Sequence, residues 1–187
     1  RKKKGVKIML HQRTLGKTIS AAGVGLHSGE KVEITLRPAS EDSGIRFRRV
    51  DCNPPQEIEA HANNVTDTRL GTTISQNNIS VMTVEHLLAA FAGLGIDNAC
   101  IDIHGPEVPI MDGSAASFIL LVELAGITEQ SKPKKFLRIK KNIRVEEDDK
   151  YAEFKPFDGY RLSFQIEFEH PMIQHQLTKF SFDFSTL

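Results

Sequence analysis

From residue 136 onward, apolar residues recur at every second position, and no helical pattern follows them. Eight of the eleven phenylalanines lie in this part of the chain. The clearest apolar series is Leu162, Phe164, Ile166 and Phe168. Such alternation predicts strands with one apolar face, and a one-sided sheet must bury that face against another layer. We therefore expect residues 136–187 to be the opening strands of an α+β domain whose covering helices are missing.

Residues 9–128 show alternation together with two helical patterns, which predicts a first, complete α+β domain. Val32, Ile34 and Leu36 alternate with charged or polar neighbours, as in a strand with one solvent-exposed face. A helical apolar stripe follows Thr83, a plausible N-cap, and Gly93 or Gly95 is a plausible stop. A second helix follows the turn at residues 112–114 and stops at Gly126. Residues 129–135 are polar and are expected to be a linker.

Composition limits the possible partners of the chain. Lys plus Arg is 24 and Asp plus Glu is 24, so the net charge of zero argues against a nucleic-acid surface. No apolar run approaches the roughly 18 residues that a membrane-spanning helix needs. Two cysteines without a CxxC pair are typical of a reducing cytoplasm, which is the predicted location. Residues 1–8 are expected to be a basic extension or an artificial remnant.

Glu85 and His86 stand side by side at the predicted start of the first helix. A carboxylate and a neutral imidazole are parts needed for a metal-bound water and its base. Acidic residues are also common in a first helical turn because they complement the helix dipole. No HxxxH pair occurs in the chain. On residue types alone, the metal-site and structural interpretations both stay open.

Two further segments are predicted to be turns. Residues 23–29 contain three glycines, but their spacing matches neither GxGxxG nor a Walker A sequence, and charged strand residues follow. A hairpin turn is favoured there over a phosphate loop. The acidic run at residues 146–149 is also expected to be a hairpin turn.

Several strings of residues, taken together, resemble one protein family across residues 9–185. The strings are Gln12-Arg-Thr14, Gly23-Val-Gly-Leu-His-Ser-Gly29, Thr83-Val-Glu-His86, Gly93-Leu-Gly-Ile-Asp-Asn98 and Pro109-Ile-Met-Asp-Gly-Ser-Ala115. The chain resembles the UDP-3-O-acyl-N-acetylglucosamine deacetylases, the zinc amidases of bacterial lipid A biosynthesis. The resemblance implies a two-layer sheet-and-helix domain that is repeated, with the second repeat truncated here and the active site between the two domains.

The resemblance also implies a reaction and its partners. The expected activity is zinc-dependent hydrolysis of the N-acetyl group of a UDP-sugar that carries an acyl chain, releasing acetate. The missing C-terminal half of the second domain would be a further partner. One alternative is a non-catalytic fragment that binds a sugar nucleotide, and another is a structural α+β domain with an incidental Glu-His pair.

By position, the resemblance implies that Glu85 is the general base and His86 a Zn²⁺ ligand. It places Lys150, Phe168, Glu167 and His27 at the substrate, although turn or core roles remain alternatives for three of these. Glu167 stands where family members often have Asp, which makes its nucleotide role less certain. The other two zinc ligands and the acid for the leaving amine are implied to lie beyond Leu187. We therefore expect the 187-residue chain alone to be inactive.

Overall fold

A computed structural model describes residues 10–169, 172 and 175–182. The expected extension at residues 1–8 lies outside this range, as do residues 183–187 of the expected second domain. The chain divides into two compact units, Arg1–Lys135 and Phe136–Leu187. In the described part of the chain, no helix has the length and apolar character required to span a membrane.

The first unit is built on a five-stranded sheet with the order β2-β3-β9-β4-β5. Its strands are β2 (Ile19–Val24), β3 (Lys31–Pro38), β9 (Ala99–His104), β4 (Ile45–Arg49) and β5 (Gln56–Glu59). All neighbouring pairs are antiparallel except β4 and β9, which run parallel. Ile34 lies opposite Ile103 and Leu36 opposite Ile101, and all four are buried. The predicted strand with one buried face and one solvent-exposed face is thus confirmed for β3.

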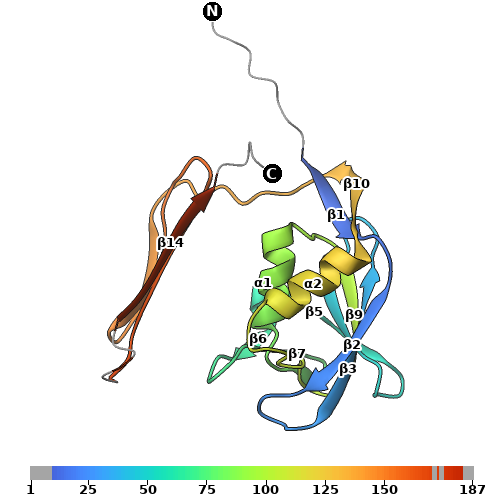
Figure 1. The fold of residues 1–187 in the computed structure, drawn as a ribbon. Coiled ribbons are helices and arrows are strands. Elements are labelled where there is room, and N and C mark those ends of the chain that lie inside the picture. The colour runs from blue at the N-terminus through green and yellow to red at the C-terminus, as the bar shows by residue number, and fades with distance from the viewer. Residues whose placement is uncertain (1–9, 170–171, 173–174, 183–187) are drawn as a thin grey trace, which may run out of the picture. The chain divides into compact units, whose positions relative to one another are not determined.

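Two helices, α1 (Glu85–Leu94) and α2 (Ala116–Ala125), form the second layer (Figure 1). They pack against each other, and their apolar side chains join those of the sheet in a single core. The buried helical residues are Leu87, Ala90, Phe91, Phe118, Val122 and Ala125. Sheet and helices together make the unit α+β, as expected.

The expected N-cap of the first helix is wrong. Val84 occupies the cap position of α1, and no side chain there accepts a hydrogen bond from the helix. Thr83 has a positive φ of 57° and donates its hydroxyl to a buried carboxylate instead. The predicted stop is confirmed, because Gly95 is left-handed with φ 69°. A left-handed residue at this position is what glycine provides without steric cost.

The turn at residues 112–114 precedes α2 and Gly126 ends it as predicted, but the cap position is Ala115, which makes no side-chain cap hydrogen bond. The backbone amide of Ala116 donates to Ser114 Oγ at 3.0 Å, and the amide of Ser114 donates to Asp112 Oδ1 at 3.1 Å. Gly126 ends the helix with φ 75°.

The expected linker at residues 129–135 is wrong over most of its length. Strand β10 (Ile127–Pro133) pairs antiparallel with β1 (His11–Leu15), and the first unit continues to Lys135. Gln130 Nε2 donates to Ala39 O at 3.0 Å, and Gln130 Oε1 accepts from Asn98 Nδ2 at 2.7 Å. The polar side chains that suggested a linker are therefore used in hydrogen bonds to distant parts of the same unit.

Short elements complete the first unit beside α1. They are the 3₁₀ turn η1 (Ala62–Asn64) and a three-stranded sheet of β6 (Val65–Asp67), β7 (Thr73–Gln76) and β8 (Ile79–Val81). Strand β8 leads into Thr83 and the first turn of α1. The β6–β7 connection and the start of α1 therefore lie close together.

The second unit consists of two antiparallel hairpins. One pairs β11 (Ile143–Glu147) with β12 (Lys150–Phe154), and the other pairs β13 (Tyr160–Glu167) with β14 (His175–Phe182). The predicted turn at residues 146–149 is confirmed, with Asp148 at φ 53°. Apolar side chains such as Phe164 and Leu162 remain exposed, and no helix occurs among the described residues after Lys135.

Candidate active site

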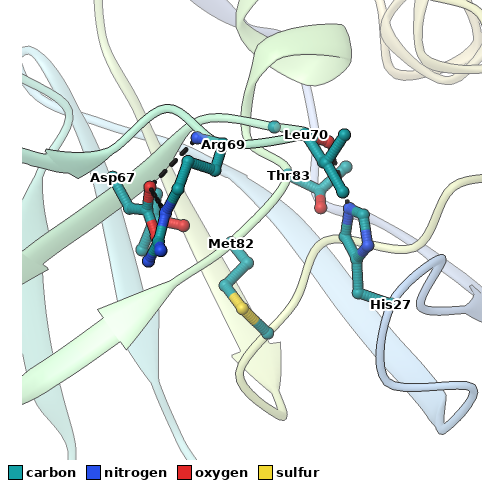
Figure 2. A pocket seen from close by; sticks show the side chains of 8 residues that line it. His27, Asp67, Arg69, Leu70, Met82 and Thr83 are labelled. Carbon is teal, nitrogen blue, oxygen red and sulfur yellow. Dashed lines mark hydrogen bonds and ion pairs between the residues drawn. The ribbon is translucent and has the colours of Figure 1, made fainter.

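A pocket opens in the first unit where the β2–β3 turn, the β6–β7 connection and the start of α1 meet (Figure 2). Its lining residues are His27, Asp67, Arg69, Leu70, Gly71, Thr73, Met82 and Thr83. Arg69 and Asp67 form an ion pair at 2.8 Å, and the Arg69 side chain is largely exposed. The pocket thus combines polar side chains with the apolar side chains of Leu70 and Met82.

Glu85 lies at one edge of this pocket, in the first turn of α1. Its Oε2 atom accepts a hydrogen bond from the backbone amide of Thr72 at 2.9 Å. Gly71 lies beside the other oxygen, because a Cβ atom built on Gly71 would stand 3.4 Å from Glu85 Oε1. The same point is 3.7 Å from His27 Nε2 and 3.8 Å from Thr83 Oγ1. The polar ends of the Glu85, His27 and Thr83 side chains therefore lie around Gly71, which has no side chain.

His27 reaches the pocket from the glycine-rich segment, which is confirmed as a hairpin turn. The amide of Gly25 donates to Glu30 O at 2.9 Å, and Gly29 has φ 68°. The His27 ring is exposed, and its Nε2 lies 3.2 Å from Leu70 O, so a proton on that nitrogen would be donated to the carbonyl (Figure 2). His27 is therefore both a turn residue and part of the pocket wall.

Glu107 lies beneath the pocket and was missed in the sequence. Its side chain has no exposed surface. The carboxylate accepts from the amide of His27 at 3.0 Å, from the amide of Ser28 at 2.9 Å and from Thr83 Oγ1 at 2.9 Å. Burial raises the pKa of Glu107, but these hydrogen bonds outweigh it and the pKa is lowered. The sequence signal for a buried carboxylate was the position of Glu107 directly before the apolar residues Val108 and Pro109.

His86 follows Glu85 in the first turn of α1 and is half-buried. Its Nδ1 atom is buried and has no hydrogen-bond partner. A buried nitrogen without a partner is costly, and a free lone pair on a neutral imidazole is what a metal ion binds. His86 therefore has the chemistry of a metal ligand.

Comparison with known proteins identifies the family. The sequence model described as LpxC, UDP-3-O-acyl N-acetylglycosamine deacetylase, matches residues 12–186. The chain belongs to this family. The resemblance that the sequence motifs indicated is thereby confirmed.

Three bacterial relatives, each named UDP-3-O-acyl-N-acetylglucosamine deacetylase, match over 178 residues. The identities are 55% with the protein of Thioalkalivibrio sulfidiphilus, 53% with that of Methylococcus capsulatus and 56% with that of Chromohalobacter salexigens. Each match covers 95% of this chain and 59% of the relative. The chain thus spans about three fifths of the length of these LpxC proteins.

A complete zinc centre is not assembled by the part of this LpxC chain that the structure describes. Catalytic zinc usually has three protein ligands, and no group of three His, Cys, Asp or Glu side chains that could hold a metal occurs in the described ranges. Among the described residues, His86 offers a buried Nδ1 atom without a hydrogen-bond partner.

The second unit contains three of the predicted substrate residues, Lys150, Glu167 and Phe168, and none of them lines the pocket of the first unit. Lys150 begins β12, opposite Glu147. Glu167 ends β13 opposite His175, whose Nδ1 lies 3.1 Å from Glu167 Oε1. All three side chains are exposed, with Phe168 at 47%. Their roles at the substrate remain predictions from the resemblance.

Proposed function

We propose that this chain is part of a deacetylase that removes the N-acetyl group from UDP-3-O-acyl-N-acetylglucosamine, releasing acetate, in bacterial lipid A biosynthesis. Membership of the LpxC family and the names of the relatives support the reaction. The observation that carries the proposal is the Glu85 carboxylate, which is held by the Thr72 amide and lies, like His27 Nε2, beside the pocket residue Gly71. The chain covers 59% of its relatives, so the activity is assigned to the full-length protein.

Glu85 acts as the general base in this proposal. Hydrolysis adds a water oxygen to the acetyl carbonyl carbon, and the water proton moves to a carboxylate oxygen of Glu85. The C–N bond then breaks as its nitrogen takes up a proton, leaving acetate and a free glucosamine amine. The acid that donates this proton is proposed to lie outside the described residues. The Thr72 amide occupies Oε2, so Oε1, beside Gly71, is the oxygen free to take the proton. Holding one oxygen orients the other at little entropic cost during reaction.

The cofactor in this proposal is Zn²⁺, with His86 as one ligand and the others outside the described residues. Zinc, when bound, lowers the pKa of its water to about 7 and polarises the amide carbonyl. The buried, unpartnered Nδ1 of His86 supports this assignment.

The second unit is proposed to contribute to binding of the UDP-sugar and to repeat the fold of the first unit. Lys150 offers an exposed ammonium group for a diphosphate, and Phe168 offers an exposed ring for the uracil or sugar. Glu167 and His27 complete the proposed substrate contacts. A cytoplasmic location is proposed as well, because Cys52 and Cys100 are both free thiols.

Acetate release tests the proposal most simply. The full-length protein is incubated with UDP-3-O-acyl-N-acetylglucosamine, and acetate and free amine are measured. Equal amounts of both products are expected, and none is expected from the analogue that already lacks the acetyl group. The 187-residue chain alone should release no acetate.

The second candidate, a non-catalytic protein that binds a sugar nucleotide, is favoured by the exposed Lys150 and Phe168 alone. Saturable binding of the UDP-sugar by the full-length protein, without acetate release, would select that alternative over the deacetylase.

A further inference from the structure

Glu107 has no part in the proposed reaction, yet it is a fully buried carboxylate directly beneath the pocket. Burying a charge is costly unless hydrogen bonds compensate it. Here the donors are the amides of His27 and Ser28 and the hydroxyl of Thr83. These donors come from two segments far apart in the sequence, so one side chain ties both to the same point.

The first segment is the turn that presents His27. Gly25 allows this turn to fold over the carboxylate, because a Cβ atom there would overlap both Glu107 Oε2 and Ser28 Oγ. The hydrogen bonds from this turn to Glu107 therefore require glycine at position 25. The His27 amide, once bonded to Glu107, fixes where the imidazole leaves the backbone.

The second segment is the connection into α1. Thr83 adopts φ 57°, a region that a β-branched residue rarely occupies. Such strain persists where surrounding contacts over-determine the backbone. The neighbouring amides are fixed too, since Met82 N donates to Pro106 O at 2.8 Å and Val84 N donates to Thr72 O at 3.3 Å. Glu85 follows two residues later, so the strained turn sets the direction from which its carboxylate approaches the pocket.

We propose that Glu107 is a positioning residue, which holds the His27 turn and the strained Thr83 turn together so that His27 and Glu85 face the same pocket. Glu107 itself contacts no substrate, because its side chain is wholly covered. The inference rests on the proposed deacetylase function for its catalytic consequence. The physical link between the two segments does not depend on that function.

A matched pair of Thr83 variants tests the catalytic consequence in the full-length protein. Thr83→Val keeps the shape and removes the hydroxyl that donates to Glu107, and Thr83→Ser keeps the hydroxyl. We expect Thr83→Val to lower kcat for acetate release roughly 10- to 100-fold through misplacement of Glu85, with KM changed less than about threefold. Thr83→Ser, which keeps the donor to Glu107, should lose clearly less of kcat than Thr83→Val. Wild-type kcat in Thr83→Val, or equal losses in both variants, would overturn the proposal.

Amide hydrogen exchange tests the link without reference to activity. Glu107→Ala removes both oxygens that accept from His27 N and Ser28 N. We expect these two amides to exchange faster in Glu107→Ala, whereas Glu30→Gln in the same turn should leave them protected. Unchanged protection in Glu107→Ala contradicts the positioning role. If the wild-type protein releases no acetate, the proposed function fails, and the exchange result alone decides whether Glu107 holds the turn.

Discussion

Glu85 Oε2 accepts a hydrogen bond from the backbone amide of Thr72 at 2.9 Å, across the edge of the pocket in the first unit. The bond ties the first turn of α1 to the β6–β7 connection, and Val84 N reinforces it by donating to Thr72 O. The carboxylate is therefore held from one side only. Its second oxygen lies beside Gly71, which has no side chain of its own.

Two glycines near the end of α1 should respond to alanine in opposite directions. Gly93 is helical, and a Cβ atom there would meet nothing within 4 Å. Gly93→Ala should stabilise the protein by about 0.5–1 kcal/mol, because alanine restricts the unfolded chain more than glycine does. Gly95 has φ 69°, so Gly95→Ala should destabilise by about 1 kcal/mol. Thermal unfolding of both variants checks this, and a destabilised Gly93→Ala variant would contradict it.

The alternation of apolar residues predicted the strands β3, β4 and β9, and apolar residues at helical spacing predicted both helices of the first unit. The start of α1 was not predictable from local residues, because the Thr83 hydroxyl bonds to Glu107, 24 positions later in the chain. For the same reason β10 was taken for a linker. Its residue Gln130 bonds to Asn98 and Ala39, and composition does not reveal such distant partners.

Of the candidate site, residue types alone suggested only the Glu85-His86 pair. His27 and Glu85 both lie beside Gly71 because of the tertiary fold. The spacing of these residues in the sequence does not reveal this. His27 entered through the family resemblance, and Glu107 through the structure alone. Roles for Lys150, Glu167 and Phe168 rest on the resemblance still.

Asp102 should make stability depend on pH. Its side chain is 8% exposed and pairs with Arg37 and Arg48, each at 2.6 Å. Burial raises the pKa of Asp102, but hydrogen bonds from the two guanidinium groups outweigh it, and the pKa is lowered. Because the folded pKa lies below the unfolded value of about 3.9, the stabilisation is present above that pH. It is lost as the pH falls through the folded pKa.

Asp102→Asn should therefore lower the free energy of unfolding at pH 7 by about 1–3 kcal/mol. The difference from wild type should shrink below about pH 4 as Asp102 itself becomes protonated. Urea denaturation at several pH values measures both effects. Asp67→Asn, which breaks the exposed pair with Arg69, is the control and should change stability little. A pH-independent difference for Asp102→Asn would refute the assigned charge state.

His86→Ala should lower the zinc content of the full-length protein, because it removes a ligand whose Nδ1 is buried and unpartnered. Elemental analysis after dialysis against a metal-free buffer measures the loss. His104→Ala, which removes an exposed histidine at the end of β9, is the matched control and should leave zinc unchanged. Undiminished zinc in His86→Ala would refute the ligand assignment.

The kcat of the full-length Glu85→Gln variant tests most directly the central claim that Glu85 is the general base. The amide keeps the size of the side chain and an oxygen for the Thr72 amide, but it cannot accept the water proton. We predict that kcat for acetate release falls by about 10²–10⁴-fold, with zinc content and thermal stability near those of wild type. Wild-type turnover by Glu85→Gln would contradict the assignment of Glu85 as the general base of a deacetylase.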